Sequence, residues 1–263
     1  MKTLKLISDN AELIASVPSD WNELSSVQIV YLIRMVENKV TAEEVKLKML
    51  LYCIDAHIRK YDNKKSNNTL YLLKVSKKEF WLTAEELASI AAVFNFLFKE
   101  KDGEISINPL LTINPFPSTQ CGCITVYGPA EGLTDITYQQ FSDLMIWSTR
   151  IGESDMYLNK FISIIYKRKT AAATPELIAK MSPTVKTAIL WFYYGCLQLI
   201  QAKFPLVFSG DGSSGDIVDG QMRTIDALAE GKLADKEKVK SALLYDALYT
   251  IQCAIEKANK VKQ

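Results

Sequence analysis

The sequence contains little of the chemistry that most enzymes and metalloproteins require. Only one of its 263 residues is a histidine, His57. The obvious candidate for a catalytic partner is Cys53, four residues earlier. A cysteine–histidine pair can activate a thiolate nucleophile, but apolar residues surround this pair in the sequence. We therefore predict a structural role for both residues, with a cysteine-dependent enzyme as an alternative.

The cysteines follow neither a disulfide nor a metal-ligand pattern. The chain has five, an odd number, and three lie within apolar helical patterns, which favours reduced, buried thiols. Cys121 and Cys123 are one residue apart, with no second cysteine pair to complete a zinc site, and a C-x-x-C redox motif is absent. We predict a strand edge or turn at this pair, and no metal or cofactor in the protein.

Strong net charge and long apolar runs are also missing. With 31 basic and 30 acidic residues the net charge is +1, so no global attraction to nucleic acid or anionic lipid is expected. The N-terminus lacks the apolar run of a signal peptide. The most apolar stretch, residues 187–200, is shorter than the roughly 20 residues of a membrane-spanning helix. We therefore expect neither a membrane nor a nucleic acid as partner.

Motifs for nucleotides and calcium are absent as well. Residues 209–220 are rich in glycine and aspartate, but they lack the lysine and hydroxyl of a P-loop. The spacing and terminal glutamate of an EF-hand are also missing. We predict a flexible loop for this segment.

What the sequence does contain is a series of helix signals. The chain is long enough to bury a substantial core in one large domain or two small ones. Four capping boxes mark helix starts, at Ser25, Thr41, Thr83 and Thr137. We predict that the second helix runs to about residue 59, which would place Cys53 and His57 on one face. The third is predicted to run to about residue 99.

The pattern between these helices predicts the remaining organisation. Residues 70–75 and 80–82 contain strand formers around a polar turn, which indicates a small hairpin. Prolines and glycines recur through residues 105–132, which predicts an irregular segment. We therefore predict a mainly α, multi-helix globular protein. Its parts would be an N-terminal helical half with the hairpin (1–104), a connecting segment (105–132) and a C-terminal helical half (133–263).

Two helices of the C-terminal half carry the most informative patterns. Residues 183–203 form a long apolar helix with aromatics around its circumference, which favours a central position. A last helix is predicted over residues 236–258. Its apolar residues Leu244, Leu248, Ile251 and Ile255 follow a 4-3-4 spacing, which is a narrow seam of the a/d type. Such a seam packs either within its own fold, the commoner case, or against a partner helix.

Three segments form a set of motifs. They are W-N-E-L with the following Gln and Tyr-Leu in residues 21–32, Y-G-P-A-E-G-L-T-D-I-T running into Gln-Phe in residues 127–141, and residues 186–208 with K-T-A-I-L-W-F-Y-Y-G-C and F-P-L-V-F. Together they resemble a family of largely uncharacterised proteins encoded in tailed phages and prophages of Bacteroidetes.

The resemblance implies a non-enzymatic assembly or interaction protein, such as a tail-assembly chaperone acting on the tape-measure protein. A structural virion component of the neck or tail is the alternative. It implies a phage tail or other virion protein as partner, a location in the bacterial host cytoplasm or the virion, and no catalytic residues. From the second motif and the C-terminal seam we select as candidate contact residues Tyr127, Gly128, Pro129, Phe141, Leu244, Leu248, Ile251 and Ile255.

Overall fold

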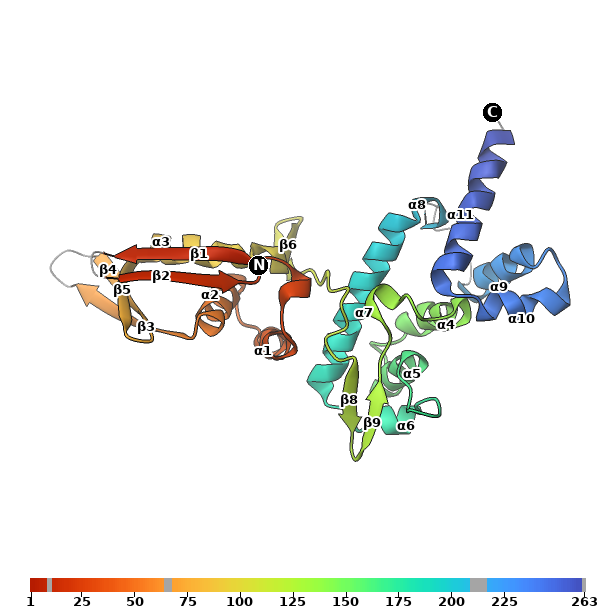
Figure 1. The fold of residues 1–263 in the computed structure, drawn as a ribbon, viewed down its shortest axis with the longest axis horizontal. Helices are drawn as coiled ribbons and strands as arrows, with labels where there is room; N and C mark the ends of the chain where they lie inside the picture. Colours follow the sequence, from red (N-terminus) through yellow and green to blue (C-terminus); the bar gives the residue numbers. More distant parts are fainter. Residues whose placement is uncertain (9–10, 64–67, 209–216, 262–263) are drawn as a thin grey trace. The chain divides into compact units, whose positions relative to one another are not determined.

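A computed structural model describes residues 1–8, 11–63, 68–208 and 217–261. The chain forms two units, Met1–Leu110 and Leu111–Gln263 (Figure 1). The division falls within residues 105–132, and the chain from Leu111 onward belongs to the second unit. The glycine-rich residues 209–216 lie outside the described part of the chain.

The prediction of a mainly α fold is wrong. Beside the helices, the described residues contain four small antiparallel sheets, which makes the protein an α+β mixture. One of these sheets lies in the segment predicted to be irregular, where β8 (Ser118–Cys121) pairs with β9 (Ile124–Tyr127). Strands this short depend on their pairing partner more than on their own pattern, so prolines and glycines dominate the sequence signal there.

The first unit contains three of these sheets. Its strands are β1 (Lys2–Ser8), β2 (Ala11–Val17), β3 (Ala56–Asn63), β4 (Asn68–Val75), β5 (Lys78–Thr83), β6 (Phe98–Lys101) and β7 (Glu104–Ile107). β1 pairs with β2, β6 pairs with β7, and β3, β4 and β5 form a sheet in that order. The predicted hairpin is confirmed as β4–β5, with Leu73 opposite Phe80.

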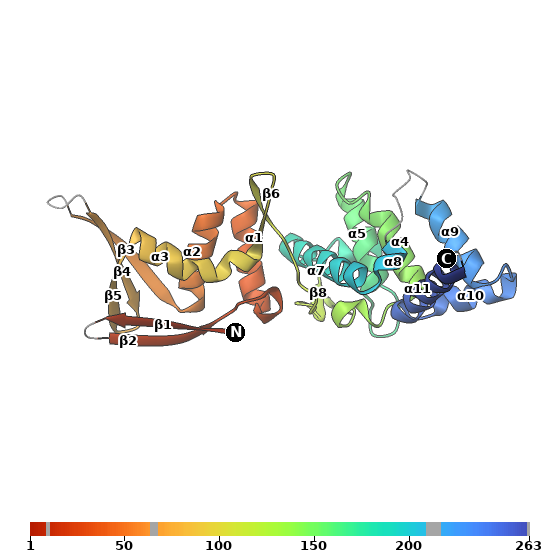
Figure 2. The same ribbon diagram turned by 90° about the horizontal axis from the view of Figure 1, so that it is seen from above.

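The helices of the first unit are α1 (Ser26–Glu37), α2 (Ala42–Cys53) and α3 (Ala84–Ala91), with 3-10 turns η1 (Trp21–Glu23) and η2 (Ala92–Leu97). Figure 2 shows α2 and α3 on one side of the β3–β5 sheet. Ser25 and Thr83 form the predicted capping boxes. Thr41 caps α2, while the side chain of Glu44 pairs with Lys48. The third predicted helix is shorter than expected, because α3 gives way to η2 after Ala91.

The second predicted helix also ends early, which separates the cysteine from the histidine. α2 stops at Cys53, Asp55 adopts a left-handed φ of 50°, and β3 starts at Ala56. His57 then lies on a strand, opposite Lys74 of β4. The prediction that Cys53 and His57 share a helix face is therefore wrong. Pairing along the whole of β4 replaces the helical hydrogen bonds that residues 56–59 would otherwise make.

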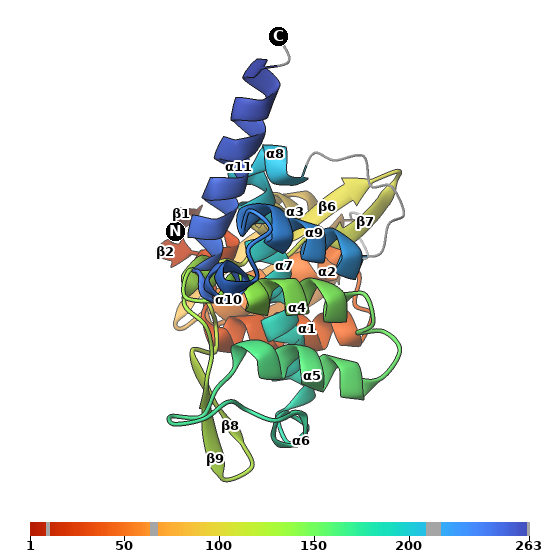
Figure 3. The same cartoon turned by 90° about the vertical axis from the view of Figure 1, so that its right-hand side faces the viewer.

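The second unit is mainly helical. Its helices are α4 (Tyr138–Ser148), α5 (Asp155–Ile165), α6 (Pro175–Ile178), α7 (Pro183–Lys203), α8 (Pro205–Phe208), α9 (Ile217–Leu228), α10 (Leu233–Ser241) and α11 (Leu244–Val261), with a 3-10 turn η3 (Glu131–Leu133). Figure 3 shows α4 and α5 in front of the long α7. Phe192 and Tyr193 of α7 are fully buried, whereas Tyr194 is 37% exposed. α7 is thus a core helix, with one side partly exposed.

The predicted last helix is interrupted at residues 242–243. Ala242 is extended, with φ −61° and ψ 147°, and Leu243 forms an antiparallel bridge with Thr137. The carbonyl of Ala242 accepts from the N–H of Tyr138, and the N–H of Leu244 donates to Ile136. Because these backbone groups bond to Ile136 and Tyr138 at the start of α4, they cannot continue a helix. α10 and α11 are therefore separate helices, and the apolar seam begins at the first residue of α11.

Candidate functional site

The Tyr127–Pro129 turn is built by packing inside the second unit. Tyr127 ends β9, and its backbone exchanges two hydrogen bonds with Lys167, of 2.8 and 2.9 Å. At Gly128 a Cβ atom would lie 2.5 Å from Cζ of Tyr166, closer than any real contact allows. This position requires glycine because an aromatic ring covers it, so the first part of the motif has an internal explanation.

A buried polar network holds the same turn. The side-chain amide of Asn114 donates to the carbonyl of Pro129 over 3.0 Å. The Tyr166 hydroxyl donates to the carbonyl of Phe116 over 2.7 Å, and burial raises the pKa of Tyr166. The hydroxyl therefore stays neutral and keeps donating. Because buried polar groups are costly when unpaired, this network fixes the turn in one conformation.

The rest of the motif joins the turn to three helices. Gly132 has a φ of +61°, and its carbonyl accepts from the hydroxyl of Tyr245 on α11 over 2.9 Å. Thr137 and Gln140 form the predicted capping box of α4, and Gln140 Nε2 also donates to the carbonyl of Ile164 on α5 over 2.9 Å. Phe141 is buried, at 5% exposure. The motif is therefore a structural junction, and of its four candidate contact residues Tyr127 is the exposed one.

The other four candidate residues lie along α11 and differ in burial. Leu244 and Leu248 are 0% and 2% exposed, whereas Ile251 and Ile255 are half-buried. Figures 1 and 3 show the C-terminal turns of α11 extending beyond the other elements of this unit. We call Leu244 and Leu248 the proximal seam, and Ile251 and Ile255 the distal seam. The structure brings the proximal seam into the core and leaves the distal seam partly open.

The environment of Cys53 does not activate its thiol. Gln28 Nε2 donates to its sulfur over 3.1 Å, and burial raises the pKa of the Cys53 thiol to about 11. His57 is exposed on β3. A catalytic thiolate needs a lowered pKa and a base within reach, and this thiol remains protonated at neutral pH.

Cys121 and Cys123 lie at the turn of the β8–β9 hairpin, as predicted for a strand edge or turn. Cys121 is buried and Cys123 is exposed, and Gly122 between them has a φ of +62°. Within the described ranges, no group of three histidine, cysteine or acidic residues is placed to hold a metal ion.

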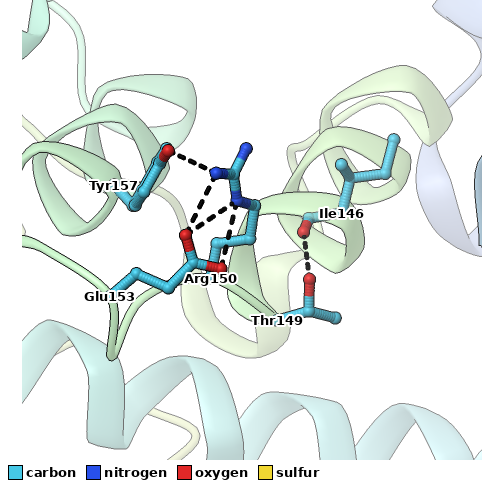
Figure 4. Close-up of polar contacts among 5 residues, drawn as sticks. All are labelled: Ile146, Thr149, Arg150, Glu153 and Tyr157. Atoms are coloured by element: carbon cyan, nitrogen blue, oxygen red, sulfur yellow. Dashed lines mark hydrogen bonds and ion pairs between the residues drawn. The ribbon is translucent and has the colours of Figure 1, made fainter.

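An exposed polar cluster closes the turn between α4 and α5 (Figure 4). Arg150 pairs with Glu153 at 3.0 Å and donates to the hydroxyl of Tyr157. Its guanidinium also lies 4.0 Å from the centre of the Tyr157 ring, and that ring stacks on Trp147. Exposed pairs of this kind contribute little stability. These residues satisfy one another within the turn, so we assign the cluster a local structural role.

Comparison with known proteins gives no relative. No family model, curated protein or solved structure matches the chain. None of the helices in the described ranges has the length and apolar character needed to cross a bilayer. The description of the protein therefore rests on its fold. An α+β unit is followed by a mainly helical unit whose last helix is amphipathic.

Proposed function

We propose that this protein is a non-enzymatic assembly or interaction protein of the tailed-phage type, and that it contacts a protein partner through the distal seam of α11. The observation that carries the proposal is the division of one continuous seam. Its proximal residues are buried, while Ile251 and Ile255 continue the same stripe and are partly exposed. Internal packing alone does not require the stripe to continue.

The chemistry of the distal turns favours a helical protein partner. A narrow stripe with 4-3 spacing is the surface that a second helix covers by knobs-into-holes packing. Complete burial of an isoleucine side chain is worth about 1.5–3 kcal/mol. The smaller part of that surface that is still exposed on the two residues gives a weak contact, suited to assembly in which several weak contacts combine.

One of the motifs that resemble the phage family contacts the base of α11. The loop at residues 127–137 bonds to α11 through Gly132 and Tyr245 and through Ile136 and Leu244. The motif residues thus position the base of the helix that we assign to partner contact. This gives a physical reason for a distinctive motif that contains no catalytic chemistry.

Mass spectrometry of phage particles purified from the bacterium that encodes this chain tests the proposal. It also separates a tail-assembly chaperone from a structural virion component. A tail-assembly chaperone acts in the host cytoplasm, co-purifies with an unassembled tail protein and is absent from mature particles. A structural neck or tail component is present at a fixed copy number. If the chain associates neither with an unassembled tail protein nor with mature particles, the proposed function is wrong.

A further inference from the structure

The first unit contains a cavity where the end of α2 meets α1 and the start of β3. Its volume is about 600 Å³, within the roughly 300–1,000 Å³ that ligand pockets occupy. The residues that give it polar or aromatic character are Tyr31, Lys48, Tyr52, Asp55 and His57. The left-handed φ of 50° at Asp55 turns the chain from α2 into β3, so His57 lines the same cavity as the last turns of α2.

Two stacked tyrosines give this cavity an aromatic wall. The ring centroids of Tyr31 and Tyr52 are 4.7 Å apart, with an interplanar angle of 21°. Each ring of such a pair uses one face for its neighbour, and Tyr52 remains 43% exposed. Ring surface is therefore left for a planar ligand.

The first sequence motif holds this wall in place. Gln28 Nε2 donates to the sulfur of Cys53 over 3.1 Å, which ties α1 to the end of α2 beside the tyrosine pair. Gln28 and Tyr31 both belong to the motif in residues 21–32. The distal seam of α11 gives this motif no role, whereas the cavity does.

The formal charge of the cavity comes from Asp55. Among the residues that the structure describes, no cation pairs with the Asp55 carboxylate and no group donates a hydrogen bond to it. The ammonium group of Lys48 already pairs with Glu44 at 2.8 Å, so these two charges offset each other. With His57 counted as neutral at pH 7, the net charge at the cavity is negative.

An aromatic wall beside an unpaired carboxylate suits a guanidinium group. This planar cation stacks on aromatic rings, and its fork of N–H donors matches the two oxygens of a carboxylate. An ammonium group carries the same charge but has no plane to stack. An anion would be repelled by Asp55, and a neutral ring would leave the carboxylate without a partner.

We propose that this cavity binds a guanidinium group, stacked on the tyrosine pair and paired with the carboxylate of Asp55. An arginine side chain of a polypeptide and a free guanidinium compound such as L-arginine share this chemistry. The site lies in the first unit and does not use the distal seam. Failure of the site therefore leaves the proposed function standing, and failure of the proposed function leaves the site standing.

The single histidine of the chain makes a direct binding test possible. Because His57 is the only histidine, its imidazole signals in the NMR spectrum of the isotope-labelled full chain report on the cavity. Titration with N-acetyl-L-arginine amide should shift these signals to saturation. The corresponding lysine amide should bind at least about fivefold more weakly, because it cannot stack or form the paired hydrogen bonds. Absence of a saturable shift with the arginine probe, or equal binding of the lysine probe, overturns the proposal.

The carboxylate is tested by Asp55→Asn. Asparagine adopts a left-handed φ as readily as aspartate, so the turn should be kept while the charge is removed. Binding of the arginine probe should weaken about tenfold. Asp102→Asn is the matched control, because Asp102 is also exposed, lies in the same unit and has a φ of 54°. Equal binding by the two variants contradicts the assignment of Asp55.

The aromatic wall is tested by Tyr52→Leu, which should weaken binding of the arginine probe about threefold. Tyr61→Leu is the matched control, because Tyr61 is also 43% exposed and lies against another ring, that of Trp81, with centroids 5.1 Å apart. Chemical denaturation of both variants shows whether each keeps its fold. Wild-type affinity in a folded Tyr52→Leu variant rejects stacking on the tyrosine pair.

The source of the guanidinium group is distinguished by two further probes. An arginine within a short capped peptide should bind at least as tightly as free L-arginine if the natural ligand is a polypeptide side chain. Tighter binding of free L-arginine assigns the site to a small molecule, and either order supports a guanidinium site. If neither probe shifts the His57 signals, the proposal is wrong.

Discussion

The two halves of the α11 seam have the same spacing but different surroundings. Leu244 and Leu248 are buried against their own unit, while Ile251 and Ile255, farther along the helix, are half-buried. A 4-3 spacing therefore determines which side chains share a face, and the rest of the fold determines what covers each part of that face. The proximal seam is core, and we assign the distal seam to a partner.

The base of α11 is fixed by directional contacts as well as by apolar packing. The hydroxyl of Tyr245 bonds to Gly132, and the ring of Phe204 packs edge-on against that of Tyr245 with centroids 5.7 Å apart. These contacts hold the first turns of the helix in place. Substitutions at the base should therefore affect stability, and substitutions beyond it should affect association.

The largest effect should come from the proximal seam. Leu248→Ala removes a fully buried side chain and should lower the free energy of unfolding by about 2–5 kcal/mol, measured by chemical denaturation. The neighbouring residue supplies the control, because Tyr249 is 64% exposed and Tyr249→Ala should change stability by less than about 0.5 kcal/mol. Equal effects of the two substitutions would show that the seam is not core.

A smaller loss is expected at the turn that supports the base of α11. Gly128→Ala places a methyl group against the ring of Tyr166 and should cost about 1–3 kcal/mol of unfolding free energy, as overpacking does. Gly152→Ala is the matched control, because a Cβ at Gly152 would meet nothing within 4 Å. A neutral Gly128→Ala would mean that the turn is not held by this packing.

The hydrogen bond between α11 and the loop should contribute less again. Tyr245→Phe removes the hydroxyl that donates to Gly132 and should cost about 1 kcal/mol, the usual net value of one such bond. Tyr249→Phe removes an exposed hydroxyl from the same helix and should be nearly silent. If thermal unfolding does not separate the two variants, the loop does not anchor the helix through this bond.

The smallest effect on stability should come from the distal seam. Ile251→Ala and Ile255→Ala remove side chains that are only half-buried, so each should lower the free energy of unfolding by at most about 1 kcal/mol. Urea denaturation of the single variants, beside Leu248→Ala, gives the comparison. Losses as large as that of Leu248→Ala would place the distal seam in the core.

The sequence predicted the features that depend on neighbouring residues. The caps at Ser25, Thr83 and Thr137 begin helices as expected, because a cap is completed within four residues. The β4–β5 hairpin was also predicted, since its turn joins adjacent strands.

Strands that depend on tertiary pairing were missed. The first half of β3, residues 56–59, falls within the predicted second helix, and only the pairing of β3 with β4 defines it as a strand. The β1–β2 hairpin had a usable signal, since Leu4 and Leu6 alternate with Thr3 and Lys5, which is the period of a strand with one covered face.

The candidate site was predictable only in part, for the same reason. Spacing identified the four seam residues, but their division into buried and half-buried pairs depends on what packs around each turn of α11. The motif around Gly128 was identified by resemblance, while its cause, the ring of Tyr166, comes from residues far along the chain.

The most direct test of the central claim measures stability and partner binding in one double variant. Ile251→Ala with Ile255→Ala should keep most of the wild-type unfolding free energy. It should also lose capture of the particle protein that we expect to co-purify with the wild type. Loss of binding with stability preserved is the result that our account predicts. Unchanged binding, or unfolding as severe as that of Leu248→Ala, would contradict it.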